Sequence, residues 1–465
     1  MVCNIGPGNQ HNGYVNAYTV RCMKDDATSS LIVKINDMTE VGSTTASASA
    51  KVSTYGDLEV IQAGFVVVSH DGVTVSNCTV FESNTKTGQI IAQITGLEPL
   101  TRYYIKAFAT TSEGTTYSEA KSFFTPNNEG VVDLSLNGTA NSYIVQPAYS
   151  TYSFKTVKGN SNESVGAVAS AEILWETYNT SDAVTQNSVI ASVELDGDKV
   201  KFTMPEDAVP GNAVIAVKDA DGTILWSWHI WVVDFDPVAT QQTYQSGAVM
   251  MDRNLGALHI ADYDPRTHGL YYQWGRKDPF VNPVSSYDFA QTYPAYEASY
   301  AEKITDYSYS IKNPTVSIVG TDWNSDNSLW SMSKTIYDPC PAGWQVPPGS
   351  SNNGAWSGFD YWYYGSWGSW GALPRVDAPY SVPDAYYSTG GYIDEYNNIN
   401  SYESSSYCYS STPNGEYAYS IQIYDWFEVN QSTHRHHKLP VRCMKQTKME
   451  GGSNEGYGES DDYEW

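Results

Sequence analysis

Two short polar segments carry residue types that can do acid–base chemistry. Asp252-Arg253-Asn254 and Arg276-Lys277-Asp278 combine carboxylates with cations, a pattern compatible with general acid–base or ion-pair catalysis. Both segments lie in turn-like contexts, where arginine–carboxylate pairs and backbone capping stabilise structure, and we predict that structural role. No His or Asn is spaced from a cysteine as a Cys–His nucleophile would require. We therefore predict a protein that is not an enzyme and has no catalytic residues.

The segment His434-Arg435-His436-His437 is the only cluster of histidines in the chain. On a strand, His434 and His436 would share a face, and such a pair could bind a transition metal. No Cys or carboxylate accompanies them at close spacing, so a solvated loop is the preferred interpretation. The sequence predicts no metal site and no cofactor.

An aromatic-rich stretch carries the strongest indication of binding. Between Trp356 and Phe427, 21 of 72 residues are Phe, Trp or Tyr, about twice the 14% of the whole chain, and Ser, Gly and Asn separate them. Antibody paratopes use the same mixture, whereas a packed core would use Leu, Ile and Val. A purely structural loop region is the alternative, and we favour recognition. The residues predicted to bind ligand are Tyr361, Trp362, Tyr363, Trp367, Trp370, Tyr407, Tyr409, Tyr424, Trp426, His434, Arg435 and His436.

Composition excludes several classes of partner. The chain has 465 residues and a formal charge of −26, which opposes binding to nucleic acid because phosphate contacts need clustered Lys and Arg. No segment has the 18 or more apolar residues that a membrane span needs, so we expect no membrane insertion. Short alternating runs bounded by turn residues predict a mainly β protein of about three domains.

The six cysteines include no Cys-x-x-Cys pair, so zinc ribbons and thioredoxin-like sites are not expected. We predict a disulfide between Cys340 and Cys443, which would close a long loop and stabilise the fold by a few kcal/mol. No partner is assigned to the other four, which are Cys3, Cys22, Cys78 and Cys408.

The two ends of the chain resemble each other. Residues 9–24 match residues 430–445 without a gap, and 7 of the 16 positions are identical, including the closing Val-Arg-Cys-Met-Lys. We interpret residues 1–26 as the terminal strand remnant of a preceding domain, and the chain as part of a longer tandem protein. The start of the chain lacks the features of a secretory signal, and an upstream segment would account for that. Coincidence is the alternative.

Residues 27–127 form the first complete predicted domain. The spacing Leu97-x-Pro99-x-Thr101-x-Tyr103 before an alternating run resembles the tyrosine corner of a fibronectin type III domain. Residues 128–236 are predicted to form a second β-sandwich, with Asp221-Gly222 as a hairpin turn. There, Trp226 and Trp228 would line one sheet face. We expect both domains to be spacers.

Residues 237–447 contain four ordered motifs, and residues 448–465 form an acidic tail that we expect to be disordered. The motifs are Met251–Ala257, Tyr271–Phe280, Tyr337–Pro347 and Val441–Cys443. They resemble the major paralogous domain family (FISUMP) of bacterial surface proteins, which implies an α+β, C-type-lectin-like fold. The calcium-dependent sugar motifs of C-type lectins are absent, so any sugar binding would rely on aromatic platforms and hydrogen bonds.

The resemblance also bears on how the surface evolves. Some C-type-lectin-like domains of this kind are diversified by retroelements at Asn, Tyr, Ser and His positions, and the two terminal repeats differ at nine interior positions. Ordinary drift between paralogues explains the same difference, and we prefer it.

The sequence thus predicts two β-sandwiches (immunoglobulin or fibronectin III-like) followed by an α+β C-type-lectin-like domain. We expect an adhesin-like protein, extracellular or at the cell surface, that binds a glycan or a cell-surface protein through the aromatic residues. The alternative is a structural subunit of a surface filament or phage fibre. It would self-associate, and its N-terminal strand would complete a neighbouring domain.

Overall fold

The computed structural model describes residues 2–4, 21–23, 30–36, 38–56, 58–69, 79–99, 101–125, 130–147, 150–205, 208–244, 246–261, 264–295, 299–302, 306–319, 325–349, 354–356, 371–372, 386–423 and 427–446. Contacts divide the chain into two units, Met1–Asn128 and Glu129–Trp465. Strands dominate the described residues, which contain a single α-helix, α1 (Tyr307–Lys312). The predicted mainly β class is confirmed. None of the helices in these ranges is both long and apolar enough to cross a membrane.

The first unit contains a two-sheet sandwich. One sheet has the order β3-β4-β7, and the other has the order β10-β8-β5-β6 with β9 also paired to β8. The strands are β3 (Ser30–Ile35), β4 (Thr45–Tyr55), β5 (Gln62–Val68), β6 (Thr79–Glu82), β7 (Gly88–Thr95), β8 (Arg102–Thr111), β9 (Gly114–Tyr117) and β10 (Lys121–Phe124). Along β7, Ile90, Ala92 and Ile94 point into the core and their neighbours are exposed, as expected for a sheet with one buried face.

The tyrosine corner of this sandwich is formed as predicted. The backbone N–H of Glu98 donates a hydrogen bond of 2.8 Å to the Tyr103 hydroxyl, and the Tyr103 ring stacks on Phe123 at 5.7 Å. This bond ties the start of β8 to the preceding loop. The strand order and the corner together support the fibronectin III-like expectation for residues 27–127.

The described N-terminal residues form an antiparallel hairpin of β1 (Val2–Asn4) and β2 (Arg21–Met23). Its register places Cys3 opposite Cys22. The rest of the predicted strand remnant, and the predicted acidic tail at 448–465, lie outside the described residues.

The second unit begins with two four-stranded sheets. Their orders are β11-β13-β16-β15 and β12-β18-β17-β14, and a core that includes Phe154, Phe202 and Trp228 fills the space between them. The strands are β11 (Val131–Asp133), β12 (Ser142–Val145), β13 (Thr151–Lys155), β14 (Ser170–Thr177), β15 (Ser192–Asp196), β16 (Lys199–Thr203), β17 (Gly211–Lys218) and β18 (Ile224–Val232), with a 3₁₀ turn η1 (Leu134–Asn137). The predicted hairpin connects β17 to β18, and Gly222 adopts a φ of 82° there.

The sheet β12-β18-β17-β14 is buried on both faces. Trp226 and Trp228 point into the sandwich, as predicted, whereas Trp231 and Val214 point the other way into the core of residues 237–447. The Trp231 indole donates to the Ala257 carbonyl at 3.1 Å. The predicted boundary at 236 therefore does not separate two domains, because one core continues across it. β17 is buried from Gly211 to Val217 and β18 from Trp226 to Val232, as expected for a sheet that is covered on both faces.

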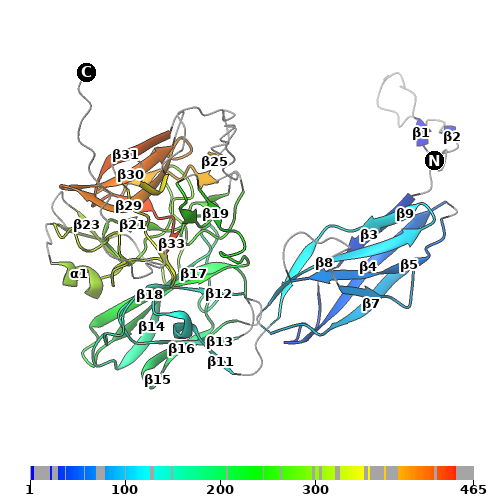
Figure 1. Ribbon diagram of the computed structural model, residues 1–465, viewed down its shortest axis with the longest axis horizontal. Helices are drawn as coiled ribbons and strands as arrows, with labels where there is room; N and C mark the ends of the chain where they lie inside the picture. The colour runs from blue at the N-terminus through cyan, green and yellow to red at the C-terminus, as the bar shows by residue number, and fades with distance from the viewer. Residues whose placement is uncertain are drawn as a thin grey trace, which may run out of the picture. The chain divides into compact units, whose positions relative to one another are not determined.

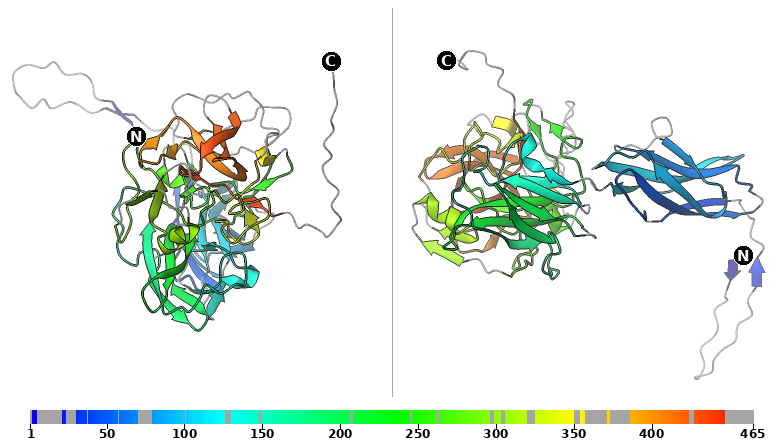
Figure 2. Two further views of the ribbon diagram at one scale, coloured as in Figure 1. Left: turned by 90° about the vertical axis from the view of Figure 1, so that its left-hand side faces the viewer. Right: turned by 90° about the horizontal axis from the view of Figure 1, so that it is seen from below.

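The remaining residues of the second unit form short sheets beyond this layer. Their strands are β19 (Gln242–Thr243), β20 (Val249–Met250), β21 (Tyr271–Gln273), β22 (Ser299–Glu302), β23 (Val316–Val319), β24 (Trp344–Gln345), β25 (Gly371–Ala372), β26 (Tyr387–Ser388), β27 (Tyr392–Ile393), β28 (Ile399–Asn400), β29 (Ser406–Asn414), β30 (Tyr417–Ile423), β31 (Phe427–His434), β32 (Lys438–Pro440) and β33 (Met444–Lys445), with 3₁₀ turns η2 (Pro265–Thr267) and η3 (Gly354–Trp356). Figures 1 and 2 show β29, β30 and β31 at the end of the unit opposite β11, β13 and β15. With one six-residue helix, the described part of this region is β rather than the expected α+β.

The predicted disulfide joins Cys340 to Cys443 within the shared core. It links segments 103 residues apart. The first of the four motifs supports the same core, because Gly256 has a φ of 83° and its carbonyl accepts hydrogen bonds from Asn179 and Asn212, both at 2.9 Å. A side chain at Gly256 would collide with Leu270 at 2.5 Å, so glycine is required there.

Candidate functional site

Seven of the predicted ligand-binding residues lie outside the described residues, so the structure says nothing of their surroundings. They are Tyr361, Trp362, Tyr363, Trp367, Trp370, Tyr424 and Trp426.

Tyr407 and Tyr409 are buried on β29, which corrects their prediction as ligand contacts. Tyr409 is fully buried, and its hydroxyl lies 2.6 Å from the carbonyl oxygen of His434 and 3.1 Å from that of His437. The Tyr407 ring packs edge-on against Tyr392 at 5.1 Å. Both rings help to fill the interior and Tyr409 holds the histidine segment in place, because a buried hydroxyl needs a hydrogen-bond partner.

Arg435 is also buried, which corrects its prediction as a ligand contact. Its guanidinium lies 4.4 Å from the ring centre of Trp274 and donates to the carbonyls of Tyr417 at 3.0 Å and Gly415 at 2.6 Å. These bonds secure the turn between β29 and β30. Arginine serves this purpose because its planar group can stack on an aromatic ring and donate several hydrogen bonds at once.

The three histidines of the segment come together, and the structure adds a carboxylate that sequence proximity did not indicate. The rings of His434, His436 and His437 have centroids 4.8–5.2 Å apart. Glu395 places its Oε2 atom 3.1 Å from Nε2 of His437 and 3.5 Å from Nε2 of His436. His436 is only 3% exposed, so the predicted solvated loop is wrong. His434 is half-buried against the ring of Tyr417.

Burial affects the protonation of this cluster. Desolvation, reinforced by the neighbouring His436, lowers the pKa of His437 and keeps its ring neutral at neutral pH. The nitrogen and oxygen atoms of Glu395, His436 and His437 that could bind a metal all lie within 4.8 Å of one another. Two imidazoles and a carboxylate form a donor set that suits divalent transition metals.

A tight turn between β27 and β28 delivers Glu395. The Asp394 carboxylate accepts hydrogen bonds from the backbone N–H groups of Tyr396 and Asn398 and from the side chains of Asn398 and Asn400, at 2.8–3.1 Å. Burial opposes ionisation of Asp394, but these hydrogen bonds lower its pKa. Asn397 adopts a φ of 66°, a conformation that Asn tolerates better than most residues.

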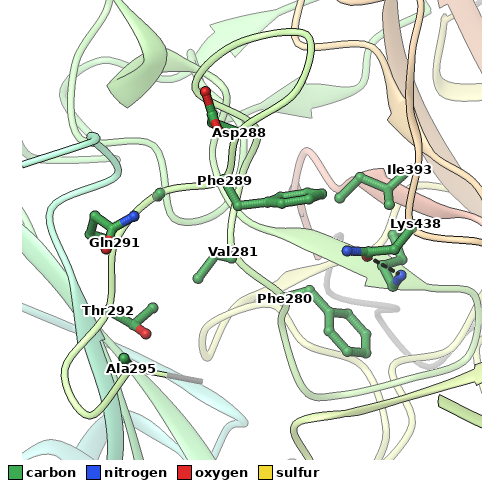
Figure 3. Close-up of a pocket in the computed structure, with 11 residues that line it drawn as sticks. Phe280, Val281, Asp288, Phe289, Gln291, Thr292, Ala295, Ile393 and Lys438 are labelled. Atoms are coloured by element: carbon green, nitrogen blue, oxygen red, sulfur yellow. Dashed lines mark hydrogen bonds between the residues drawn. The ribbon is translucent and has the colours of Figure 1, made fainter. Parts of the chain in front are cut away.

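The same turn contributes to a pocket of about 400 Å³. Figure 3 shows Asp288, Phe289, Gln291 and Thr292 along one wall, with Ile393 and Lys438 across from them. The lining residues are Phe280, Val281, Asp288, Phe289, Ala290, Gln291, Thr292, Ala295, Ile393, Asn397 and Lys438. The pocket thus combines apolar and aromatic walls with a few polar groups, which is the usual composition of a ligand site.

Lys438 is the cation of the pocket. Its ammonium donates to Oδ1 of Asn397 at 3.1 Å and lies 5.2 Å from the centre of the Phe280 ring. Burial, helped by the positive charge of Arg276, lowers the pKa of Lys438 to about 7.

The polar segments considered for catalysis make ion pairs and hydrogen bonds inside the second unit. Asp252 and Arg253 form a bidentate pair at 2.7–2.8 Å, with the guanidinium over the ring of Phe235. Arg276 donates to the carbonyls of Asn313, Pro314 and Val316 at 2.7–2.9 Å.

Lys277 and Asp278 join this core by bonding to each other and to Ser227 on β18, at 2.6–2.7 Å. They connect the sandwich of residues 130–236 to the motif region, which is residues 237–447 with the four motifs. Both side chains are buried, and neither lines the pocket.

Sequence reasoning missed Glu395, Asn397, Lys438, Phe280 and Phe289. Phe280 ends one of the four motifs, but nothing local marks any of the five as a ligand contact, and they come from three segments that are far apart in the chain. The pairing of β21, β27 and β32 in one sheet brings Lys438 beside the β27–β28 turn, and the bridge between Tyr271 and Phe280 adds Phe280.

Comparison with known proteins leaves the family open. No family model matches the chain, and no curated protein matches it. The sensor domain of the anti-sigma factor RsgI4 from Pseudobacteroides cellulosolvens has 19% identity over 22% of this chain and 78% of its own, with a TM-score of 0.18. The sixth fibronectin type III domain of human fibronectin type III domain containing protein 3 has 20% identity over 21% of this chain and 86% of its own, with a TM-score of 0.17. These similarities concern about a fifth of the chain and do not bear on the site.

Proposed function

We propose that this protein is a non-catalytic, adhesin-like ligand-binding protein that works outside the cell or at its surface. In this proposal the second unit recognises a glycan, with one sugar residue held in the pocket beside Lys438. The observation that carries the proposal is the composition of that pocket, which unites the rings of Phe280 and Phe289 with the amide of Asn397. Aromatic rings pack on the apolar faces of sugars, while amide and ammonium groups bond to hydroxyls.

The size of the pocket supports a small occupant. A volume of about 400 Å³ lies at the lower end of the range of about 300–1,000 Å³ for ligand sites, so a single ring fits better than an extended molecule. The disulfide between Cys340 and Cys443 supports an oxidising, extracellular compartment. The motifs that resemble FISUMP domains are consistent with a surface role, and the C-type-lectin-like fold that they imply remains part of the proposal.

The test is a glycan array probed with the full chain beside a panel of cell-surface proteins. Phe289→Ala removes one aromatic wall, and Asn397→Gly removes the amide while keeping the left-handed backbone accessible. Tyr287→Ala is the matched control, because Tyr287 lies in the same loop, is 90% exposed and does not line the pocket. We expect specific glycan hits that the first two changes weaken at least tenfold and the control leaves unchanged.

Other outcomes would support a different binding surface, a different ligand or a different function. Hits that survive both pocket changes but vanish on substitution of Trp362, Trp367 and Trp426 would place recognition on the aromatic-rich stretch. Binding to a protein alone would replace the glycan with a cell-surface protein. Silence on both panels, with polymers that disappear on deletion of residues 1–26, would favour the structural subunit of a filament or fibre.

A further inference from the structure

The cluster of Glu395, His436 and His437 is separate from the pocket lining and has the chemistry of a metal site. The three residues come from two segments, the β27–β28 turn and the connection between β31 and β32. Zinc and related divalent ions bind imidazole nitrogen and carboxylate oxygen, and sites with three protein ligands keep a fourth position for water or another ligand.

The distances fit such a site. Ligand atoms about 2.0–2.1 Å from a tetrahedral zinc ion lie roughly 3.3 Å from one another. The Glu395 oxygen is 3.1 Å from one histidine nitrogen and 3.5 Å from the other. The two histidine nitrogens lie within 4.8 Å of each other, so small rotations of the rings would complete the geometry.

The surroundings of the cluster would hold these ligands in place. The carbonyl of His436 accepts a hydrogen bond of 2.8 Å from the Gln273 side chain, and the His437 ring stacks on Tyr392 at 5.1 Å. A further imidazole, that of His434, lies 4.8 Å from the His436 ring, and its buried Nδ1 atom makes no hydrogen bond to any residue that the structure describes. A buried polar atom without a hydrogen bond is costly, and a metal-bound water would give it one.

We propose that Glu395, His436 and His437 bind one divalent transition-metal ion of the Zn²⁺ class. The ion clamps the β27–β28 turn to the segment before β32. This metal site is distinct from the proposed glycan pocket, because Glu395, His436 and His437 do not line that pocket.

The experiment uses the full chain, freed of metal by a chelator and dialysed. Zinc binding is measured by isothermal titration and elemental analysis, and Co²⁺ serves as a spectroscopic probe of coordination. We expect one equivalent of zinc, a Co²⁺ absorption band typical of nitrogen and oxygen ligands, and a rise in melting temperature with zinc. Glu395→Gln and His437→Gln should each weaken zinc binding at least tenfold and abolish the rise.

Two matched controls are available on the surface of the same unit. Glu403→Gln and His259→Gln change an exposed carboxylate and an exposed imidazole outside the cluster and should leave zinc binding unchanged. Glu395→Gln alters a partly exposed side chain by one atom, so its result remains decisive if His437→Gln fails to fold. No stoichiometric binding at 100 µM zinc, or equal binding by Glu395→Gln and the unaltered chain, would overturn the proposal and leave an ion pair between Glu395 and the histidines.

Discussion

At the scale of single residues, buried polar side chains make hydrogen bonds that hold the second unit together. His229 is fully buried, with Nε2 2.8 Å from Oδ1 of Asn212 and Nδ1 3.1 Å from Oγ of Ser142. Both ring nitrogens of His229 therefore have hydrogen-bond partners inside the second unit. Burial lowers the pKa of His229 to about 3, so the folded protein keeps the ring neutral.

The change His229→Gln should reduce the loss of stability on acidification. The folded pKa lies below the unfolded value of about 6.5, so the unfolded chain takes up the proton first. The stability that the neutral His229 ring contributes to the folded protein is therefore fully present above about pH 6.5, and it is lost as the pH falls toward 3. When the pH falls from 7 to 5, the free energy of unfolding of the variant should decrease by about 2 kcal/mol less than that of the unaltered chain.

Urea unfolding followed by tryptophan fluorescence measures this difference, because all 14 tryptophans lie in the second unit. His259→Gln, at an exposed position, is the control. Equal pH dependence in the variant and the unaltered chain would show that His229 does not couple stability to pH.

Tyr409→Phe tests whether the Tyr409 hydroxyl stabilises the fold or contacts a ligand. The change removes a buried hydroxyl that bonds to the carbonyls of the histidine segment. We expect a loss of about 1–2 kcal/mol in the free energy of unfolding and unchanged affinity for any ligand held in the pocket. Denaturant unfolding and a binding assay on the same sample measure both quantities. A variant that keeps its stability but loses its ligand would restore Tyr409 as a contact residue.

At the scale of elements, the β27–β28 turn connects the two candidate sites. Glu395 faces the histidines, and Asn397, two residues later, lines the pocket. The turn keeps its shape because the Asp394 carboxylate accepts four hydrogen bonds from residues that follow it.

Asp394→Ala should loosen this turn and impair both sites together. We expect a loss of about 1–2 kcal/mol in stability, faster hydrogen exchange at the amides of Tyr396 and Asn398, and weaker zinc binding. Asp326→Ala, which removes a comparable carboxylate cap from Ser328, is the control and should leave zinc binding intact. Unchanged exchange in Asp394→Ala would mean that the strands, not the carboxylate, hold the turn.

At the scale of the whole second unit, the sandwich of residues 130–236 and the motif region behave as one folded body. The sheet containing β17 and β18 supplies side chains to the cores on both of its faces. Polar bonds reinforce the junction, since Asn141 donates to the carbonyls of Ile336 and Asp338, both at 2.8 Å.

A fragment of residues 238–446 should therefore fail to fold by itself, whereas residues 129–446 should fold. Removing the sandwich would expose the apolar face that Trp231 and Val214 cover. Amide proton dispersion in NMR spectra and the cooperativity of urea unfolding distinguish the two fragments. A cooperative, well-dispersed fragment of 238–446 would reinstate the predicted boundary at 236.

The sequence by itself determined the features that depend on local pattern. Alternating residues specified the strands, Asp221-Gly222 specified a hairpin, and the spacing before Tyr103 specified the tyrosine corner. Such features need only a few neighbouring residues. The pairing of Cys340 with Cys443 was also predictable, because two cysteines of the same domain could close a long loop.

Only the tertiary structure decided what depends on distant segments. Glu395 joins the histidines across 41 residues, and Tyr409 and Arg435 are buried against Trp330 and Trp274, which lie far from them in the sequence. The merging of two predicted domains into one core has the same origin, because the fold of the whole chain decides which segment packs on the second face of the β17–β18 sheet. Local pattern shows which side chains are apolar or polar, and the packing of the whole chain decides what they contact.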